Sequence, residues 1–202
     1  MIRILGLSAL LSIAIVSQAS AQSGFGERPT VGVFGGLTVP TGDFADEVAK
    51  GWHAGGLVKI RVYRAIDARV DGTYSKLGKK DLVGTETSFH TDGTVSFGTL
   101  SAVVNMGPDS AMYPGDNSVS PYLVAGAGAY RIDFAATCSG TCDTFEAPSI
   151  DTNLGFNIGL GASLPLAGIR GFVEGRYHRV SRSADVGGNR SMFLFSAGLR
   201  FR

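Results

Sequence analysis

Residues 151–166 read DTNLGFNIGLGASLPL, and their side chains alternate along the chain between polar and apolar types. A period of two is typical of a β-strand, in which successive side chains point to opposite faces. One face carries Thr152, Leu154, Phe156, Ile158, Leu160, Ala162 and Leu164, and the other carries Asp151, Asn153, Asn157 and Ser163. The stretch predicts a strand that separates an apolar space from a polar one.

The same alternation recurs along the rest of the chain and predicts an all-β fold. Residues 94–106 are the least regular, because Val95 and Phe97 have one parity whereas Leu100 and Val104 have the other. We interpret this change as a β-bulge or a misplaced strand boundary. Including 151–166, the expected strands are residues 30–40, 52–63, 66–76, 94–106, 121–134, 151–166, 169–180 and 189–201.

The polar faces of several strands carry charges, which distinguishes two kinds of barrel. In residues 66–76, for example, Asp67 and Arg69 alternate with aliphatic side chains. A soluble barrel has an apolar interior, whereas a barrel in lipid has an apolar exterior and polar groups inside. The same pattern in residues 121–134 places Tyr130 outside and Arg131 and Asp133 inside.

Charges inside a barrel need partners, because burying an unpaired charge is costly. We expect the interior charges to pair across the lumen in one network. Two interpretations remain open, since the charges could pack a narrow barrel or line a narrow water path. An eight-stranded barrel is barely wide enough for side chains to fill its interior. The predicted members are Lys59, Arg61, Asp67, Arg69, Asp71, Arg131, Asp133, Arg170, Glu174, Arg176 and His178.

The connections between the expected strands alternate in length, as in barrels that have short periplasmic turns and longer outside loops. The short ones are Arg64-Ala65 and Ala167-Gly168. The longer, polar ones are residues 41–51, 78–88, 135–149 and 181–188. Residues 107–120 are the exception, a long connection on the short-turn side. Residues 42–47 are acidic and are expected to form a solvated surface loop.

The N-terminus has the pattern of a secretory signal peptide. Arg3 supplies a positive charge, residues 4–16 are apolar, and Ala19-Ser20-Ala21 has the small-residue form of a cleavage site. The apolar run is too short for a membrane-spanning helix, which needs about 20 residues. We predict a signal peptide at residues 1–21 and one mature domain at residues 22–202. An uncleaved anchor is the alternative.

Cys138 and Cys142 flank Ser-Gly-Thr in one of the longer connections. In an exported protein, an isolated cysteine pair is most often a disulfide. The alternative is a metal or redox pair, but no histidine lies nearby in the sequence. We predict a disulfide between Cys138 and Cys142.

Three segments resemble the eight-stranded outer-membrane β-barrel family that includes the OmpA- and OmpX-type barrels. They are GGLTVPTGDF at residues 35–44, PYLVAGAG at residues 121–128 and FSAGLRFR at residues 195–202. The last is similar to the C-terminal assembly signal of such barrels. The resemblance implies an eight-stranded antiparallel up-and-down transmembrane β-barrel in the bacterial outer membrane. It also implies contact with lipid and lipopolysaccharide, and insertion by the barrel assembly machinery.

Three classes of function fit such a barrel. We favour a structural or surface-interaction role, in which the outside loops bind a surface ligand. A narrow passive channel is the second class, and a lipid-modifying enzyme is the third. His178 has Ser181 and Ser183 nearby in the sequence, but a catalytic set also needs an orienting carboxylate. We therefore expect no enzyme and no cofactor, and 18 basic against 17 acidic residues give no indication of a nucleic-acid partner.

Overall fold

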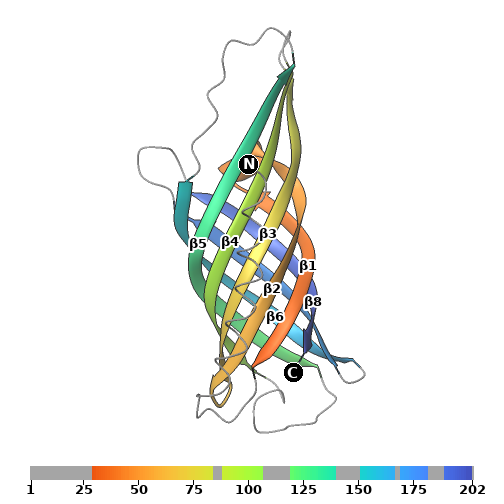
Figure 1. Ribbon diagram of the computed structural model, residues 1–202, viewed down its shortest axis with the longest axis vertical. Helices are drawn as coiled ribbons and strands as arrows, with labels where there is room; N and C mark the ends of the chain where they lie inside the picture. Colours follow the sequence, from red (N-terminus) through yellow and green to blue (C-terminus); the bar gives the residue numbers. More distant parts are fainter. Residues whose placement is uncertain are drawn as a thin grey trace, which may run out of the picture.

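The computed structural model describes residues 29–83, 88–106, 119–139, 151–166, 169–181 and 189–201, with the backbone alone at residues 79–83, 88–92, 134–139 and 151. Each strand pairs antiparallel with the next, and β8 pairs with β1, so the sheet closes into a barrel (Figure 1). The predicted eight-stranded antiparallel up-and-down barrel is confirmed. The strands are β1 (Thr30–Thr41), β2 (Ala49–Tyr63), β3 (Ile66–Val83), β4 (Ser88–Asn105), β5 (Ser120–Ser139), β6 (Asp151–Leu166), β7 (Ile169–Val180) and β8 (Arg190–Phe201).

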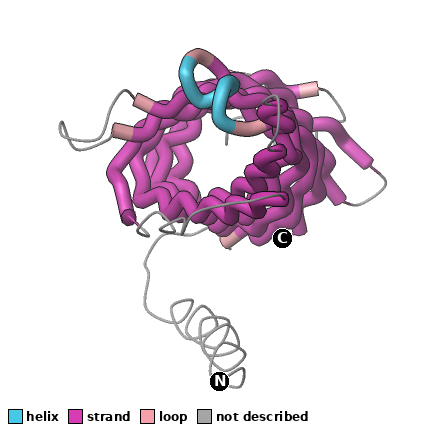
Figure 2. Tube along the Cα trace, turned by 90° about the horizontal axis from the view of Figure 1, so that it is seen from above, coloured by secondary structure: helices cyan, strands magenta, loops and turns pink. Residues whose placement is uncertain are grey.

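The two ends of the barrel differ. At one end β3, β4 and β5 rise beyond the other strands, and the short helix α2 (Asp43–Glu47) lies at the rim (Figures 1 and 2). We call this the loop end. At the opposite end, which we call the turn end, Arg64-Ala65 joins β2 to β3 and β8 stops at Phe201. Within the described part of the chain, no helix is long and apolar enough to cross a membrane.

Several strands are longer than the sequence pattern predicted. β2 begins at Ala49, so the last residues of the predicted 41–51 loop belong to a strand. β3 continues to Val83, β4 already begins at Ser88, and β5 continues to Ser139. The predicted loop at residues 78–88 is therefore wrong, as is the first part of the predicted loop at residues 135–149. β3, β4 and β5 pair with one another beyond the rim, where Ser88 lies opposite both Val83 and Ser139. Most of the 107–120 connection lies outside the described residues.

The outer face of the barrel is apolar, as predicted. On β6, Leu154 and Ile158 are 74% and 57% exposed, whereas Asn157 between them is 2% exposed. On β8, Phe195 is 54% exposed and Arg200 is 7% exposed. The exterior therefore suits a lipid environment along these strands.

The interior near the loop end is apolar, which the sequence analysis did not anticipate. The pairing of β3 with β4 is continuous from Val95 to Leu100, so no bulge causes the change of parity there. The alternative prediction of a misplaced boundary is correct, because β4 begins at Ser88 and not at residue 94. The parity changes because Val95 and Phe97 face inward near the loop end, whereas Leu100 and Val104 face outward farther along the strand. The inward side chains form an apolar cluster of Phe44, Val48, Leu77, Val95, Phe97, Tyr130, Ile132, Val180, Met192 and Leu194.

Helix α2 replaces the solvated loop that was expected at residues 42–47. Its Phe44 side chain is 1% exposed and belongs to the apolar cluster. The guanidinium carbon of Arg190 lies 5.6 Å from the centre of the Phe44 ring, and Nη2 of Arg190 lies 2.8 Å from Oε2 of Glu47. This ion pair and cation–π contact hold α2 as a cap on the apolar cluster.

Inward-facing glycines make room for aromatic rings in the narrow interior. Gly161 on β6 lies opposite Tyr122 on β5. A Cβ added to Gly161 would lie 2.4 Å from Cζ of Tyr122, and one added to Gly155 would lie 2.8 Å from Cε2 of Tyr130. Both distances are shorter than any real contact of this kind, so a methyl group at either glycine would displace the ring.

Replacing Gly161 by alanine is expected to lower the free energy of unfolding by about 1–3 kcal/mol, the usual cost of overpacking a filled interior. Gly72→Ala is the matched control, because a Cβ at Gly72 meets nothing within 4 Å. That control should change the free energy by less than about 0.5 kcal/mol. Urea unfolding in lipid vesicles, followed by the fluorescence of Trp52, measures both. Equal effects of the two substitutions would contradict the prediction.

Candidate functional site in the barrel interior

Two arginines and two carboxylates form a ring of ion pairs in the lumen. Arg69 and Asp71 lie on β3, and Glu174 and Arg176 lie on β7. Between the strands, Nη1 of Arg69 lies 2.7 Å from Oε2 of Glu174, and Nη1 of Arg176 lies 3.2 Å from Oδ2 of Asp71. Within the strands, Nε of Arg69 lies 2.6 Å from Oδ1 of Asp71, and Nε of Arg176 lies 2.6 Å from Oε1 of Glu174. We call these four residues the ion ring.

The ion ring reaches from one wall of the barrel to the opposite wall. In the closed strand order, three strands separate β3 from β7 on either side, so the two strands face each other across the lumen. The two charged residues of each strand are two positions apart, which places them on the same face. None of the four side chains is more than 6% exposed. The ring therefore spans the lumen at its level with charges that are paired and equal in number.

Neutral side chains complete the hydrogen bonding of the ion ring. The Tyr122 hydroxyl donates to Oε2 of Glu174 at 2.8 Å, and the Thr99 hydroxyl donates to Oδ2 of Asp71 at 3.2 Å. Hydrogen bonds of this kind to ionised groups are stronger than those between neutral groups. Each carboxylate is therefore bonded to both arginines and to one hydroxyl.

An aromatic layer also contacts the ion ring. Phe34, Leu57 and Phe172 form a small buried cluster in the interior. The guanidinium carbon of Arg69 lies 6.0 Å from the ring centre of Phe34 and 5.7 Å from that of Phe172. The guanidinium of Arg200 lies 4.9 Å from the Phe172 ring. Cation–π contacts therefore stabilise both arginines inside the barrel.

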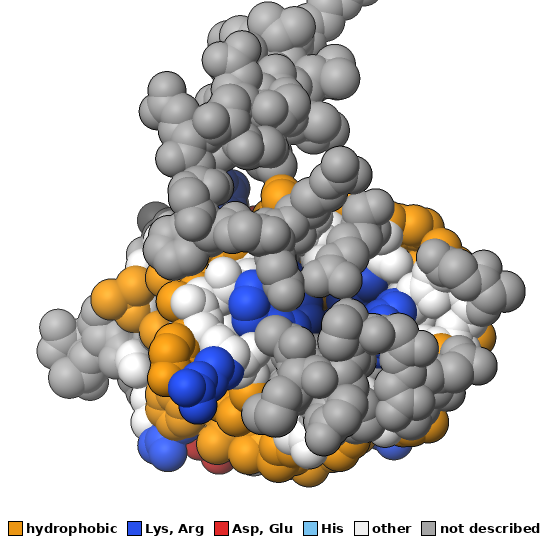
Figure 3. Space-filling view, turned by 90° about the horizontal axis from the view of Figure 1, so that it is seen from below, with side chains coloured by type: hydrophobic (Ala, Val, Ile, Leu, Met, Phe, Trp, Pro, Cys, Tyr) orange, Lys and Arg blue, Asp and Glu red, His pale blue; other side chains and the backbone are white. Residues whose placement is uncertain are grey.

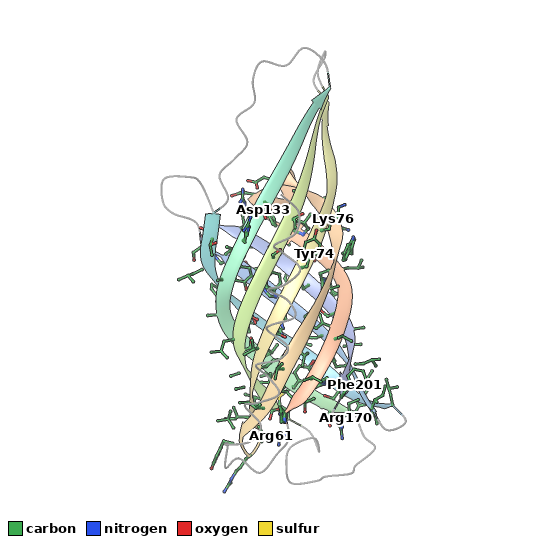
Figure 4. The ribbon with its side chains drawn as sticks, in the orientation of Figure 1. Arg61, Tyr74, Lys76, Asp133, Arg170 and Phe201 are labelled. Carbon is green, nitrogen blue, oxygen red and sulfur yellow. The ribbon has the colours of Figure 1, made fainter. Side chains whose placement is uncertain are left out.

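A second group of charges lies at the turn end around Asp67, whose side chain is 1% exposed. Asp67 pairs with Nζ of Lys59 at 2.6 Å and with Arg61, and it accepts a hydrogen bond from Asn105 at 2.8 Å. Arg61 and the half-buried Arg170 both lie at this end (Figure 4). Lysine and arginine side chains gather near the centre of this end, inside an apolar rim (Figure 3). The turn end of the lumen is therefore basic.

The two interior histidines bond to neutral partners. Nδ1 of His53 lies 3.1 Å from the Thr38 hydroxyl, and its Nε2 lies 2.8 Å from the Ser196 hydroxyl. His178 is fully buried, and its Nδ1 shares a hydrogen bond of 2.9 Å with the Tyr130 hydroxyl. Among the described residues, the hydrogen-bond partner of the His178 ring is therefore Tyr130 and not one of the interior charges with which His178 was grouped from the sequence.

The interior position predicted for Arg131 and Asp133 is wrong. Their side chains are 53% and 36% exposed, and Nε of Arg131 lies 3.1 Å from Oδ2 of Asp133. Tyr130 and Ile132 occupy the inward positions of β5 at this level, so the charged residues between them face outward. Figure 4 places Asp133 toward the loop end of the barrel.

The structure brings most of the other predicted charges together inside the barrel. The sequence analysis missed several of their polar partners. It also missed a separate interior contact, in which Nη2 of Arg200 donates to the Ser163 hydroxyl. Parity alone would have placed Ser163 and Arg200 on inward faces. A tyrosine such as Tyr122 gives no such signal, because its side chain suits either face. The ion ring and the turn-end group unite Lys59, Arg61, Asp67, Arg69, Asp71, Glu174 and Arg176, and their missed partners are Thr99, Asn105 and Tyr122.

Two sequence predictions lie outside the described residues. Cys142 falls in the 140–150 gap and only the backbone of Cys138 is described, so the disulfide stays a prediction. The signal peptide at residues 1–21 also stays a prediction. Within the described part of the chain, no group of three or more His, Cys, Asp or Glu side chains could hold a metal ion.

The closed barrel, apolar outside and charged inside, is the architecture of a transmembrane β-barrel. The chain matches the outer membrane protein beta-barrel domain family over residues 7–201. Because this match covers nearly the whole chain, the chain belongs to that family. The protein is therefore a β-barrel of the bacterial outer membrane, as its sequence resemblance implied.

Solved structures with a similar fold support the same architecture. The chain is similar to the crystal structure of Neisserial surface protein A, with 19% identity, a TM-score of 0.56, and coverage of 85% of this chain and 95% of that one. It is also similar to the outer membrane protein OprG from Pseudomonas aeruginosa, with 12% identity, a TM-score of 0.50, and coverage of 87% and 97%. At these identities the likeness concerns the fold alone. Comparison with curated proteins finds no match.

Proposed function

We propose that this protein is a structural and surface-interaction barrel that acts through its loop end, without enzymatic activity and without conducting solutes. The ion ring carries the proposal, because its paired charges cross the lumen from β3 to β7. Nearer the loop end, the apolar cluster and Phe44 occupy the interior as well. Contact with other molecules then falls to the outer face and the loop-end connections.

The three long strands support a role at the loop end. β3, β4 and β5 extend the sheet beyond the rim, so their tips lie away from the rest of the barrel (Figure 1). Because outer-membrane barrels keep short turns on the periplasmic side, the loop end faces the outside of the cell. The partners we propose are a surface ligand at this end, outer-membrane lipid and lipopolysaccharide around the barrel, and the barrel assembly machinery during insertion.

A narrow passive channel is the second candidate function. The basic turn end favours it, because charged side chains line the interior from Asp67 and Lys59 to the ion ring. A rearrangement of these ion pairs would be needed before water and ions could pass.

Single-channel recording in planar bilayers distinguishes the two functions. We expect the reconstituted protein to give no steps of conductance. Phe44→Ala should be equally silent, because the ion ring lies below the cap and remains paired. Protease added to intact cells should cut loop-end connections and remove surface binding, while the barrel stays in the membrane. Conductance that survives this treatment would overturn the proposal in favour of the channel.

A further inference from the structure

Two arginines on neighbouring strands lie directly opposite each other inside the turn end of the barrel. Arg170, near the start of β7, is in register with Arg200, near the end of β8. Arg200 is 7% exposed, and Arg170 is half-buried. Residues in such a position have Cβ atoms about 4.5–5.5 Å apart, and like charges placed there repel each other. The pair therefore attracts negative charge.

The contacts of Arg200 bring its charge toward Arg170. The guanidinium carbon of Arg200 lies 4.9 Å from the ring centre of Phe172, and its Nη2 donates to the Ser163 hydroxyl on β6. Phe172 and Arg170 are two positions apart on β7, so they share a face of that strand. The guanidinium of Arg200 therefore lies over the strand that carries Arg170, and the two cations form one patch.

The other charges at the turn end leave this patch positive. Lys59 and Arg61 both pair with Asp67, the one carboxylate among the described interior residues of that end. With Arg170 and Arg200, four basic side chains face one acidic side chain, an excess of three. Figure 4 places Arg61 and Arg170 at this end, and Figure 3 shows Lys and Arg side chains at its centre, inside an apolar rim.

The ion ring does not offset this excess, because its two arginines and two carboxylates balance each other. A narrow space that is lined by one sign of charge and has apolar walls concentrates the electric field and attracts ions of the opposite sign. The turn end faces the periplasm, so the anion enters from that side. We propose that the turn end of the lumen is a binding site for a phosphate group.

A phosphate group matches the patch in geometry and in charge. The planar guanidinium of an arginine donates two parallel hydrogen bonds to phosphate oxygens. Phosphate carries about −1.5 to −2 charges at neutral pH, which offsets more of the excess than the single charge of a phospholipid headgroup. Free phosphate is therefore the expected ligand, and a headgroup beside the rim is the other source. The site goes beyond the proposed function, because it lies at the end opposite the loop end.

Titration of the refolded full barrel with inorganic phosphate tests the proposal, in maltoside micelles that contain no phosphate of their own. We expect the side-chain Nε–H signals of Arg170 and Arg200 to shift until they saturate in nuclear magnetic resonance spectra. The urea midpoint of unfolding should rise, because the ligand binds the folded barrel. Sodium chloride at the same ionic strength is the control and should do neither. Equal shifts with chloride overturn the proposal.

Arg170→Gln distinguishes a phosphate site from a generally basic interior. The variant should bind phosphate about tenfold more weakly or worse, because it loses charge-assisted hydrogen bonds. Arg131→Gln is the matched control, since it removes the same charge from an exposed pair on the outer face and should leave the affinity unchanged. Unchanged affinity in Arg170→Gln overturns the proposal. Should that variant fail to fold, the titration of the unaltered protein decides.

Phosphatidylglycerol added to the same micelles distinguishes the two sources of phosphate. Shifts of the Arg170 and Arg200 signals with inorganic phosphate assign the site to the free ion. Shifts with phosphatidylglycerol alone assign it to a lipid headgroup, and the phosphate site stands in both cases. If neither compound shifts these signals, the proposal is wrong.

Discussion

Replacing Glu174 by glutamine is expected to lower the free energy of unfolding by about 3–5 kcal/mol, the cost of breaking a buried ion pair. The Glu174 carboxylate bonds to Arg69, Arg176 and the Tyr122 hydroxyl. An amide of the same size keeps the packing but removes the charge. Asp71 would then face both arginines alone, and the lumen would hold an excess positive charge away from bulk water.

The exposed pair of Arg131 and Asp133 offers a matched control for Glu174→Gln. Asp133→Asn makes the same chemical change in a pair that is 53% and 36% exposed. Exposed ion pairs contribute about 0–1 kcal/mol, so this variant should unfold at nearly the same urea concentration as the unaltered protein. Equal losses in the two variants would show that burial of the ion ring does not determine its contribution.

Replacing Ile158 by arginine should lower the free energy of unfolding by about 2–4 kcal/mol, because it places a charge in the middle of the lipid-facing surface. Ile158 lies near the centre of β6 and is 57% exposed on the outer face. Its guanidinium would have to leave water for hydrocarbon. Urea titration of the protein folded into lipid vesicles measures the loss.

Leu166→Arg is the matched control for Ile158→Arg, because it places the same charge on the same face at a different depth in the membrane. Leu166 has the same parity as Ile158 but ends β6 at the turn end, where it is 43% exposed. Near the interface the cost of arginine falls to about 0–1 kcal/mol. If the two substitutions destabilise the barrel equally, the assignment of the lipid-facing band is incorrect.

The bounds of two strands were predictable from sequence. β6 and β7 have the bounds that the alternation predicted. On β6, lipid on one side and polar groups on the other impose a constant parity. The interior is not polar throughout, because buried apolar side chains lie along it together with the charges. On β5 the inward side chains beyond Ser120 are apolar or aromatic, so Tyr130 and Ile132 face inward while Arg131 and Asp133 face outward. Alternation gives the parity of a strand without identifying which face is inside.

The members of the ion ring could be named from sequence, but their pairing could not. Arg69 and Glu174 are 105 residues apart in the chain and meet only because β3 and β7 face each other. That meeting depends on the number of strands and on the register of each pair. The same holds for α2, because its Phe44 is buried by side chains from distant strands.

The pairing of β1 with β8 imposes an order of events on biogenesis. Val31, near the start of the first strand, lies opposite Phe201, at the end of the last. Contacts this distant in sequence form slowly, because the entropy lost in closing long loops precedes the energy gained. A chain without its last strand would expose two open sheet edges, which favour aggregation. Closure of the barrel therefore follows export of the last strand, and until then the open edges of the sheet have to be kept from pairing with other chains.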